Sequence, residues 1–442
     1  MEASQALHPA TVPARATPAG AGRARWAWTA PEVWTARMLT ALDEGVRGGR
    51  WFTLMDKVYA LPTLRAAFAR VKANRGAPGV DHVTVAMYEA RLGANLAALS
   101  ASLRAGTYRP QPIRRHWIPK GPRERRPLGI PTVRDRVVQT ALRLVLEPIV
   151  DATFAQQSYG FRPTRSAKAA LRRVVTLLRD GHRYVVDVDL QTYFDSIPHG
   201  PLRARVQSKV SDGRVLALVD AFLHQPIFEG LAQWTPDEGT PQGAVISPLL
   251  ANLYLDPLDH AVAAAGFEMV RYADDFVVLC RTAEEAEQAL VLVQRWTAAA
   301  GLRLHPEKTH LVDMQSADGF DFLGYHFQRG HRWPRKKSLR NLKDAVRQHT
   351  SRTNGHSLAV IIADVNRTLV GWFAYFKHSH GTFGALDAWV RMRLRSILRR
   401  RNGRHGRGRA SDHHRWPTRF FSAQGLFSLT HAHAAVRQSY VR

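Results

Sequence analysis

The sequence predicts an α+β fold followed by a helical, strongly basic carboxyl-terminal region. Two observations carry this prediction. Apolar strands in the middle of the chain are interrupted or joined by aspartates, whereas the segment after residue 335 shows helical periodicity and many arginines. With 442 residues, 45% of them hydrophobic, the chain can form about two to four domains and bury a sizeable core.

The positive charge is unevenly distributed along the chain. The net charge is +27, and residues 331–442 hold 23 Lys and Arg against four Asp, so this segment alone carries +19. A solubilising surface would also be basic, but charge clustered in one segment is typical of proteins that bind a polyanion. We therefore expect nucleic acid as a partner of the carboxyl-terminal third.

The cysteine content and the absence of apolar runs limit the class of protein. Cys280 is the only cysteine, so an intramolecular disulfide and a cysteine-ligated zinc site are both excluded. No uncharged apolar run approaches the ~18 residues of a membrane span, and no secretory signal is visible at the start. We expect a cytoplasmic protein with no membrane partner. Structural zinc is not expected either, because the carboxyl-terminal histidines lack ligand spacing: His405, His413, His414, His431 and His433.

The expected elements follow the chain in order. Residues 1–30 are rich in Ala, Pro, Gly and Arg without a period, which predicts a disordered tail. Helical patterns then fill an amino-terminal extension over 31–110. Residues 111–330 mix helices with strands at 184–190, 269–280, 302–314 and 320–327, and basic helices occupy 335–400, ahead of a basic tail over 401–442.

Two acidic segments in the mixed region predict a metal-dependent centre. Asp187 and Asp189 interrupt an apolar strand, and Asp274-Asp275 forms the turn between two others. Burying unpaired carboxylates is costly, and carboxylate oxygens suit Mg²⁺. Either segment alone could be an ordinary hairpin turn or strand end, and Asp187 is interpreted as structural.

A set of motifs in fixed order distinguishes these interpretations. Arg271-Tyr272-Ala273-Asp274-Asp275-Phe276 resembles the Tyr-x-Asp-Asp signature of reverse transcriptases, and Asp189 to Asp195 resembles their first catalytic block. The intervening and following blocks are similar too: Gly239-Thr240-Pro241-Gln242-Gly243, Ser247-Pro248 with Asn252, Gly301 to Thr309, and Phe322-Leu323-Gly324-Tyr325. Blocks at Arg126 to Pro131 and Ser158 to Ser166 resemble the group II intron-encoded branch of the family.

This resemblance implies a right-hand polymerase with fingers and palm to about residue 330, followed by an α-helical thumb or maturase domain. It implies an RNA-directed DNA polymerase with catalytic residues Asp189, Asp274 and Asp275. The metal-binding residues would be Asp189, Leu190, Asp274 and Asp275, which hold two Mg²⁺ ions. Its partners would be an RNA template, intron RNA, a DNA primer or target, and deoxynucleoside triphosphates.

The resemblance also assigns residues to the incoming nucleotide. Lys120 and Arg126 would bind its triphosphate, Phe194 would exclude the 2′-hydroxyl, Gln242 would line the pocket, and Lys308 would act on pyrophosphate. Each assignment has an alternative. Lys120 and Arg126 are two of many basic residues, Phe194 could be core, Gln242 could belong to a Pro-Gly turn, and Lys308 stands alone.

The basic helical third resembles the maturase-specific thumb domain. Trp372, Tyr375 and Phe376 are interpreted as bundle core, although exposed aromatics can stack on bases. We expect RNA to contact five arginines at helical spacing: Arg391, Arg393, Arg395, Arg399 and Arg400.

The function that follows is reverse transcription, with binding of intron RNA that assists splicing and retrohoming. Two alternatives remain open on sequence alone: a protein that acts mainly as an RNA-binding splicing maturase, and a related enzyme recruited to host defence or repair. Because Cys280 is the only cysteine, we expect no cysteine-bearing endonuclease domain, and the sequence does not indicate how target DNA would be cleaved.

Overall fold

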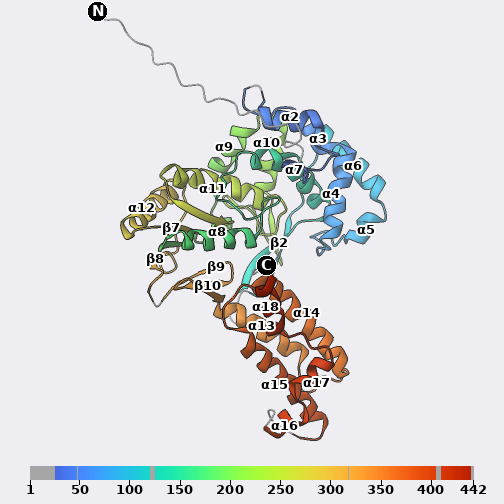
Figure 1. Ribbon diagram of the computed structural model, residues 1–442. Coiled ribbons are helices and arrows are strands. Elements are labelled where there is room, and N and C mark those ends of the chain that lie inside the picture. Colours follow the sequence, from blue (N-terminus) through green and yellow to red (C-terminus); the bar gives the residue numbers. More distant parts are fainter. Residues whose placement is uncertain (1–24, 47, 120–124, 317, 405–409, 440–442) are drawn as a thin grey trace, which may run out of the picture.

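The computed structural model describes residues 25–46, 48–119, 125–316, 318–404 and 410–439. Lys120 and most of the expected tail over 1–30 therefore lie outside the described residues. Figure 1 shows a broad α+β body, with an elongated helical domain projecting from it. The body and the helical domain are the expected palm with fingers and the expected thumb, which confirms the predicted fold class.

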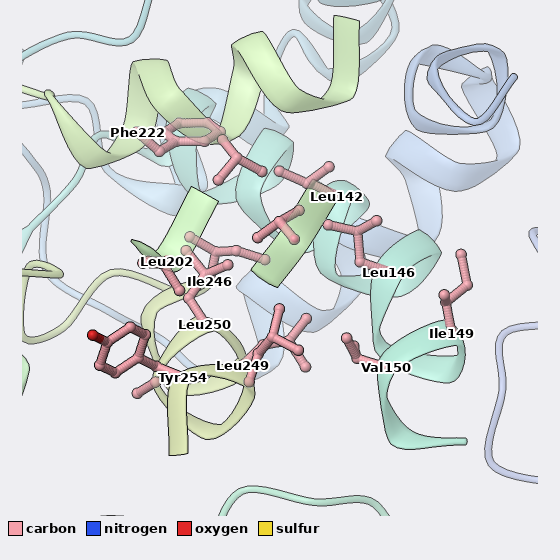
Figure 2. Packing of buried hydrophobic residues seen from close by; sticks show 14 of the residues in the cluster. Leu142, Leu146, Ile149, Val150, Leu202, Phe222, Ile246, Leu249, Leu250 and Tyr254 are labelled. Carbon is pink, nitrogen blue, oxygen red and sulfur yellow. The ribbon is translucent and has the colours of Figure 1, made fainter. Parts of the chain in front are cut away.

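Amino-terminal helices and the helices behind the palm share one core. The extension consists of α2 (Ala36–Glu44), α3 (Met55–Tyr59), α4 (Leu61–Ala73), α5 (Val85–Glu89) and α6 (Leu92–Ala105). Its apolar residues join a buried cluster with α7 (Val133–Asp151), α9 (His199–Lys209), α10 (Gly213–Leu223) and α11 (Ser247–Ala264). Figure 2 shows Leu142 and Leu146 of α7 and Leu249 of α11 as members of this cluster. The extension is thus packed into the body as part of it.

Among the polar contacts that fix the extension to the body are those of Trp34 and Asp212. The indole N–H of Trp34 donates to the carbonyl of Leu144, in the middle of α7, at 2.9 Å. The carboxylate of Asp212 accepts from the backbone N–H groups of Leu54 and Met55 at 2.7 and 2.9 Å. The same carboxylate caps α10 by accepting from the N–H groups of Arg214 and Val215.

The fingers contain a four-stranded sheet in the order β2-β1-β4-β5. Its strands are β1 (Ile113–Pro119), β2 (Arg125–Ile130), β4 (Ile227–Glu229) and β5 (Ala232–Trp234). Strands β1 and β2 are antiparallel, and β4 joins β1 in parallel. This sheet borders the palm because the backbone N–H of Gly129 donates to the carbonyl of Gln242 at 2.5 Å.

The palm sheet has the order β6-β7-β3-β8 and is antiparallel throughout. Its strands are β3 (Tyr184–Asp189), β6 (Glu268–Tyr272), β7 (Asp275–Cys280) and β8 (His310–Asp313). Alternate side chains point to opposite faces. Val186 and Val188 join the core shared with α11 and with α12 (Ala283–Ala299), whereas Val185 faces α8 (Ala167–Arg179).

A three-stranded sheet links the palm to the thumb. It consists of β9 (Phe320–Phe322), β10 (Tyr325–Gln328) and β11 (His331–Pro334) in the order β11-β10-β9. The single strand expected over 320–327 is therefore a hairpin, because Leu323 and Gly324 adopt positive φ angles of 47° and 83°. The hydroxyl of Tyr325 donates to the carbonyl of Tyr375, and that of Tyr375 to the carbonyl of Leu323, at 2.7 and 2.8 Å.

The thumb is a helical bundle that doubles back on itself. Helices α13 (Lys336–His349), α14 (Leu358–Phe376) and α15 (Phe383–Arg401) are followed by α16 (Ala410–Arg415), α17 (Thr418–Ala423) and α18 (Leu429–Ser439). Figure 1 shows α16 at the far end and α18 returning toward the palm. Helix α14 has the length and apolar composition of a membrane-crossing helix, but its Ile361, Val365 and Leu369 form the core of this bundle.

The described part of the expected basic tail belongs to this bundle. Trp416, Phe421 and Leu429 are buried in the same core as α13, α14 and α15. Burying such large apolar side chains stabilises the helices that carry them. Residues 410–439 therefore extend the helical domain beyond the boundary that the sequence predicts at residue 400.

Candidate active site

Two neighbouring strands of the palm sheet bring the three predicted catalytic aspartates together. Asp189 ends β3 and lies directly opposite Asp275, the first residue of β7. Asp274 occupies the turn between β6 and β7, whose flanking residues Tyr272 and Asp275 are paired in register. In this turn, Ala273 has a φ of +62°. Residues far apart in the sequence thus form one acidic cluster.

The acidic cluster is electrostatically strained. Burial, reinforced by the charge of Asp274, raises the pKa of Asp275 to about 7. Burial also raises the pKa of Asp274, and burial together with Asp275 raises the pKa of Asp187 to about 8. Lys308 partly offsets this negative charge, because its Nζ atom lies 3.0 Å from Oδ2 of Asp189. The cluster therefore favours an added cation.

The cluster is not a preformed metal cage. Within the part of the chain that the structure describes, no three His, Cys, Asp or Glu side chains are arranged to hold a metal ion. Leu190, the fourth predicted metal-binding residue, has a buried apolar side chain and pairs with Leu304 in a β-bridge. Only its backbone carbonyl could serve as a ligand.

A buried polar network holds the catalytic turn from behind. The guanidinium of Arg271 pairs with the carboxylate of Asp259 on α11, its Nε lying 2.7 Å from Oδ1, and both side chains are completely buried. Its Nη1 atom also donates to the carbonyl of Ala273 and to Oδ1 of Asn252, both at 2.9 Å. The peptide of the turn is therefore fixed by a charged donor from an adjacent strand.

The segment that contains Gly160 contacts both this network and the catalytic turn. The amide of Asn252 donates to the carbonyl of Gly160 at 2.7 Å. A Cβ atom on Gly160 would collide with the backbone of Ala273, so only glycine fits against the turn. The sequence motif beginning at Ser158 thus has a physical role in supporting the catalytic turn.

Two of the predicted nucleotide residues, Phe194 and Gln242, belong to segments that contact each other. Phe194 follows the β3 strand, is half-buried, and its carbonyl accepts from the N–H of Thr240 at 2.6 Å. The amide of Gln242 donates to Asp195 at 3.1 Å. Gly243 adopts a φ of +104°, and a Cβ there would collide with the carbonyl of Gly129. These contacts place the loop over 239–243 between fingers and palm.

Of the two predicted triphosphate-binding cations, only Arg126 lies within the described residues. Arg126 is exposed on β2, paired in register with Ile118 of β1. Among the described residues, no ion pair joins it to the acidic cluster. Lys120 lies outside the described residues. Of the predicted nucleotide residues, Lys308 therefore contacts a catalytic aspartate, Gln242 contacts Asp195, and Arg126 lies on β2 of the fingers.

Comparison with known proteins identifies the family. Residues 118–327 match the model described as reverse transcriptase (RNA-dependent DNA polymerase), and residues 339–416 match the group II intron maturase-specific domain. Protein YkfC of Escherichia coli is 33% identical over 357 residues, which cover 71% of this chain and 87% of YkfC. The chain belongs to the reverse transcriptases and maturases encoded by group II introns.

Two further similarities are more limited in extent. The group II intron-encoded protein LtrA of Lactococcus lactis is 42% identical over 164 residues, but these cover only 36% of this chain and 27% of LtrA. A chain of a solved Cas6-RT-Cas1–Cas2 complex is 27% identical, with a TM-score of 0.37, and the match covers 58% of this chain and 43% of that one. The family assignment makes the protein an RNA-directed DNA polymerase with a maturase domain and nucleic acid partners.

Two of the five arginines predicted to bind RNA are buried in the maturase domain. Arg395 is 3% exposed and donates through Nε to the carbonyl of Trp416 at 2.9 Å. Arg399 is 8% exposed and pairs with buried Asp412, its Nη1 lying 2.9 Å from Oδ2. These two arginines hold α16 and the segment after it against α15, so they are not available to RNA in this structure.

The other three arginines are more accessible. Arg393 is half-buried and ties α15 to the end of α13, because its Nη2 donates to the carbonyl of Thr350 at 2.6 Å. Arg391 is half-buried and Arg400 is exposed. RNA contact therefore remains a prediction for Arg391, Arg393 and Arg400.

Sequence reasoning missed Asp259 as a functional residue. It follows Asn252 by seven residues on α11, so both lie on one face of the helix. The signal that could have revealed them is the presence of buried polar residues, Asn252 and Asp259, on one face of a helix whose other buried residues are mostly apolar. Their partner, Arg271, belongs to the Tyr-x-Asp-Asp motif, but the position of Arg271 in the sequence does not indicate which carboxylate it pairs with.

Proposed function

We propose that this reverse transcriptase adds deoxynucleotides to a DNA primer on an RNA template, using two Mg²⁺ ions bound by Asp189, Asp274 and Asp275. The single observation that carries the proposal is the register of the palm sheet, which sets Asp189 opposite Asp275. The carbonyl of Leu190 is proposed as an additional ligand. Such ions activate a 3′-hydroxyl and stabilise the departing pyrophosphate.

The chemistry of the site supports a divalent cation. Its donors are carboxylate oxygens, which Mg²⁺ prefers, and neither cysteine nor histidine belongs to the cluster. Burial and the neighbouring carboxylates raise the pKa of Asp274 and Asp275 despite the opposing effects of Arg271 and Arg335, so the cluster is short of positive charge. Lys308 supplies one cation, on Asp189 alone. A charge deficit of this kind is what bound cations offset.

The other residues of the site would orient the nucleotide. Phe194, five residues after Asp189, would exclude a 2′-hydroxyl by filling the space beside the sugar with its ring. Gln242, held by Asp195, would line the pocket, and Gly243 lets the fingers approach closely. Lys308 would neutralise the phosphate that leaves, in exchange for its contact with Asp189. Arg126 and Lys120 are proposed to reach the triphosphate from the fingers.

The experiment that tests this function is primer extension on an RNA template with purified protein. Asp274→Asn keeps the shape of the side chain but removes a charged ligand, so synthesis should be lost. Asp344→Asn is the matched control, because Asp344 is exposed on α13 and pairs only locally with Arg347. Extension by Asp274→Asn at the wild-type rate would refute the assignment.

The maturase domain supports a second role in the same molecule. We propose that it binds the intron RNA and thereby assists splicing and retrohoming, in the cytoplasm. A role in intron mobility and a role in host defence or repair predict different DNA beside the gene. A catalytic intron RNA in the flanking DNA supports mobility and splicing, whereas its absence supports a role in host defence or repair. An intact polymerase centre argues against a protein that acts only in splicing.

A further inference from the structure

A basic groove lies at the junction of palm and thumb, away from the catalytic aspartates. It consists of two adjoining cavities of about 580 and 410 Å³, which share Leu178 of α8 and Gly330 of the β10–β11 turn. Six cationic side chains line it, and no carboxylate is among the lining residues described for either cavity. The six cations are Arg179, Arg183, Arg329, Arg332, Lys377 and Arg437.

Four separate segments contribute cations to this groove. Arg179 ends α8 of the palm, and Arg329 lies in the hairpin after β10. Lys377 follows α14, and Arg437 lies on α18, which returns from the far end of the thumb. Figure 1 shows these elements meeting where the thumb joins the body. Whatever occupies the groove would therefore contact palm and thumb at once.

The electrostatics of the groove are those of an anion site. Burial, reinforced by Arg332 and Lys377, lowers the pKa of His378 to about 4. Burial and Arg437 also lower the pKa of His433. Within the part of the chain that the structure describes, no carboxylate is among the groups that shift the pKa of either histidine. Both imidazoles are neutral near pH 7 and can still donate one hydrogen bond each.

The groove is separate from the polymerase centre. The backbone N–H of Leu323, at the near end of the β9–β10 hairpin, lowers the pKa of Asp275, which places this end of the hairpin beside the acidic cluster. Strand β10 then runs away from that end, and at about 3.3 Å per residue its four residues place the groove roughly 13 Å further on. A nucleotide held at the aspartates would not reach these cations.

We propose that the groove binds consecutive phosphates of an RNA strand outside the catalytic centre and so fixes the thumb against the palm. A strand of phosphates fits this site better than one small anion, because the cations extend through two adjoining cavities. The proposal deepens the RNA-binding role given above, and it is independent of the two-metal assignment. It adds a contact surface formed jointly by the polymerase body and the maturase domain.

The test is a double variant, Arg179→Gln with Lys377→Gln, which removes one cation from each domain. The matched control is Arg295→Gln with Arg419→Gln, which removes equal charge from exposed sites on α12 and α17. Binding of a short labelled RNA is followed by fluorescence anisotropy over a range of salt concentrations. The groove variant should bind more weakly, and its salt slope should flatten by about 0.7 log unit for each single-strand phosphate that the protein no longer neutralises.

A second measurement separates RNA from free phosphate. Thermal unfolding is compared in inorganic phosphate and in chloride at equal ionic strength for wild type and both double variants. Loss of RNA affinity in the groove variant alone supports the proposal. Wild-type affinity and slope in that variant would overturn it, as would a phosphate-dependent rise in Tm without any change in RNA binding. Primer extension at saturating primer–template reports separately on the proposed polymerase function.

Discussion

The guanidinium of Arg271 and the carboxylate of Asp259 form a fully buried ion pair directly behind the catalytic turn. Because the ion pair fixes the guanidinium of Arg271, its hydrogen bond to the carbonyl of Ala273 also fixes the turn. A rigid support of this kind keeps the catalytic ligands in place. If the support is mobile, the catalytic rate falls even though every ligand is present.

Asp259→Asn should therefore lower kcat for primer extension more than it changes KM for the nucleotide. It should also reduce the free energy of unfolding by about 3–5 kcal/mol, because the charge of Arg271 is left buried without its partner. Asp256→Asn is the matched control, since Asp256 is buried on the same helix but accepts from the N–H of Ala155 instead of supporting the turn. If both variants lose stability while keeping the wild-type kcat, Asp259 has no positioning role.

Phe194→Ala should increase incorporation of ribonucleotides relative to deoxynucleotides. Removing the ring would open space beside the sugar, while the backbone contact of Phe194 with Thr240 is retained. Side-by-side extension with both nucleotide types measures the ratio, and circular dichroism checks the fold. A folded variant with unchanged discrimination would assign Phe194 to packing alone.

Asp212→Asn should destabilise the protein near neutral pH by about 1–2 kcal/mol, because a charged cap shared by four backbone N–H groups is weakened. Burial alone would raise the pKa of Asp212, but the amides of Met55, Leu54, Val215 and Arg214 lower it overall. The stabilisation by the carboxylate is therefore present above the unfolded pKa of about 4 and is lost as pH falls through the lower folded value. Urea unfolding should show the wild-type advantage shrinking below about pH 4, and an advantage independent of pH would contradict this reasoning.

The arginines of α15 should divide into two groups. Arg391→Gln with Arg400→Gln should weaken binding to structured RNA and flatten its salt dependence, with little change in Tm. Arg399→Gln should lower the stability of the thumb by about 3–5 kcal/mol, because Asp412 would remain buried without a counter-charge. Anisotropy and thermal unfolding on the same preparations test both. Equal RNA affinity in all variants would make this face of the helix a solubilising surface.

How far the sequence predicts the structure depends on the range of each interaction. The acidic cluster was predictable because Asp189 and the Asp274-Asp275 pair each sit in a local pattern that implies strand pairing. The role of Arg395 and Arg399 was not, because helical spacing gives the face of α15 but does not reveal that Asp412 and Trp416 fold back onto it. Asp259 escaped for the same reason, since its partner lies on another element.

The central position of β3 in the palm sheet has a consequence for synthesis on the ribosome. Both neighbours of this strand, β7 and β8, are encoded after it, and β8 ends only at Asp313. Until they emerge, the nascent chain carries Asp189 on a strand with two open edges, a state that is prone to wrong pairing and aggregation. The amino-terminal helices and α7 precede β3 and can begin to pack earlier. The catalytic centre is thus assembled late in translation, when most of the polymerase body has already been made.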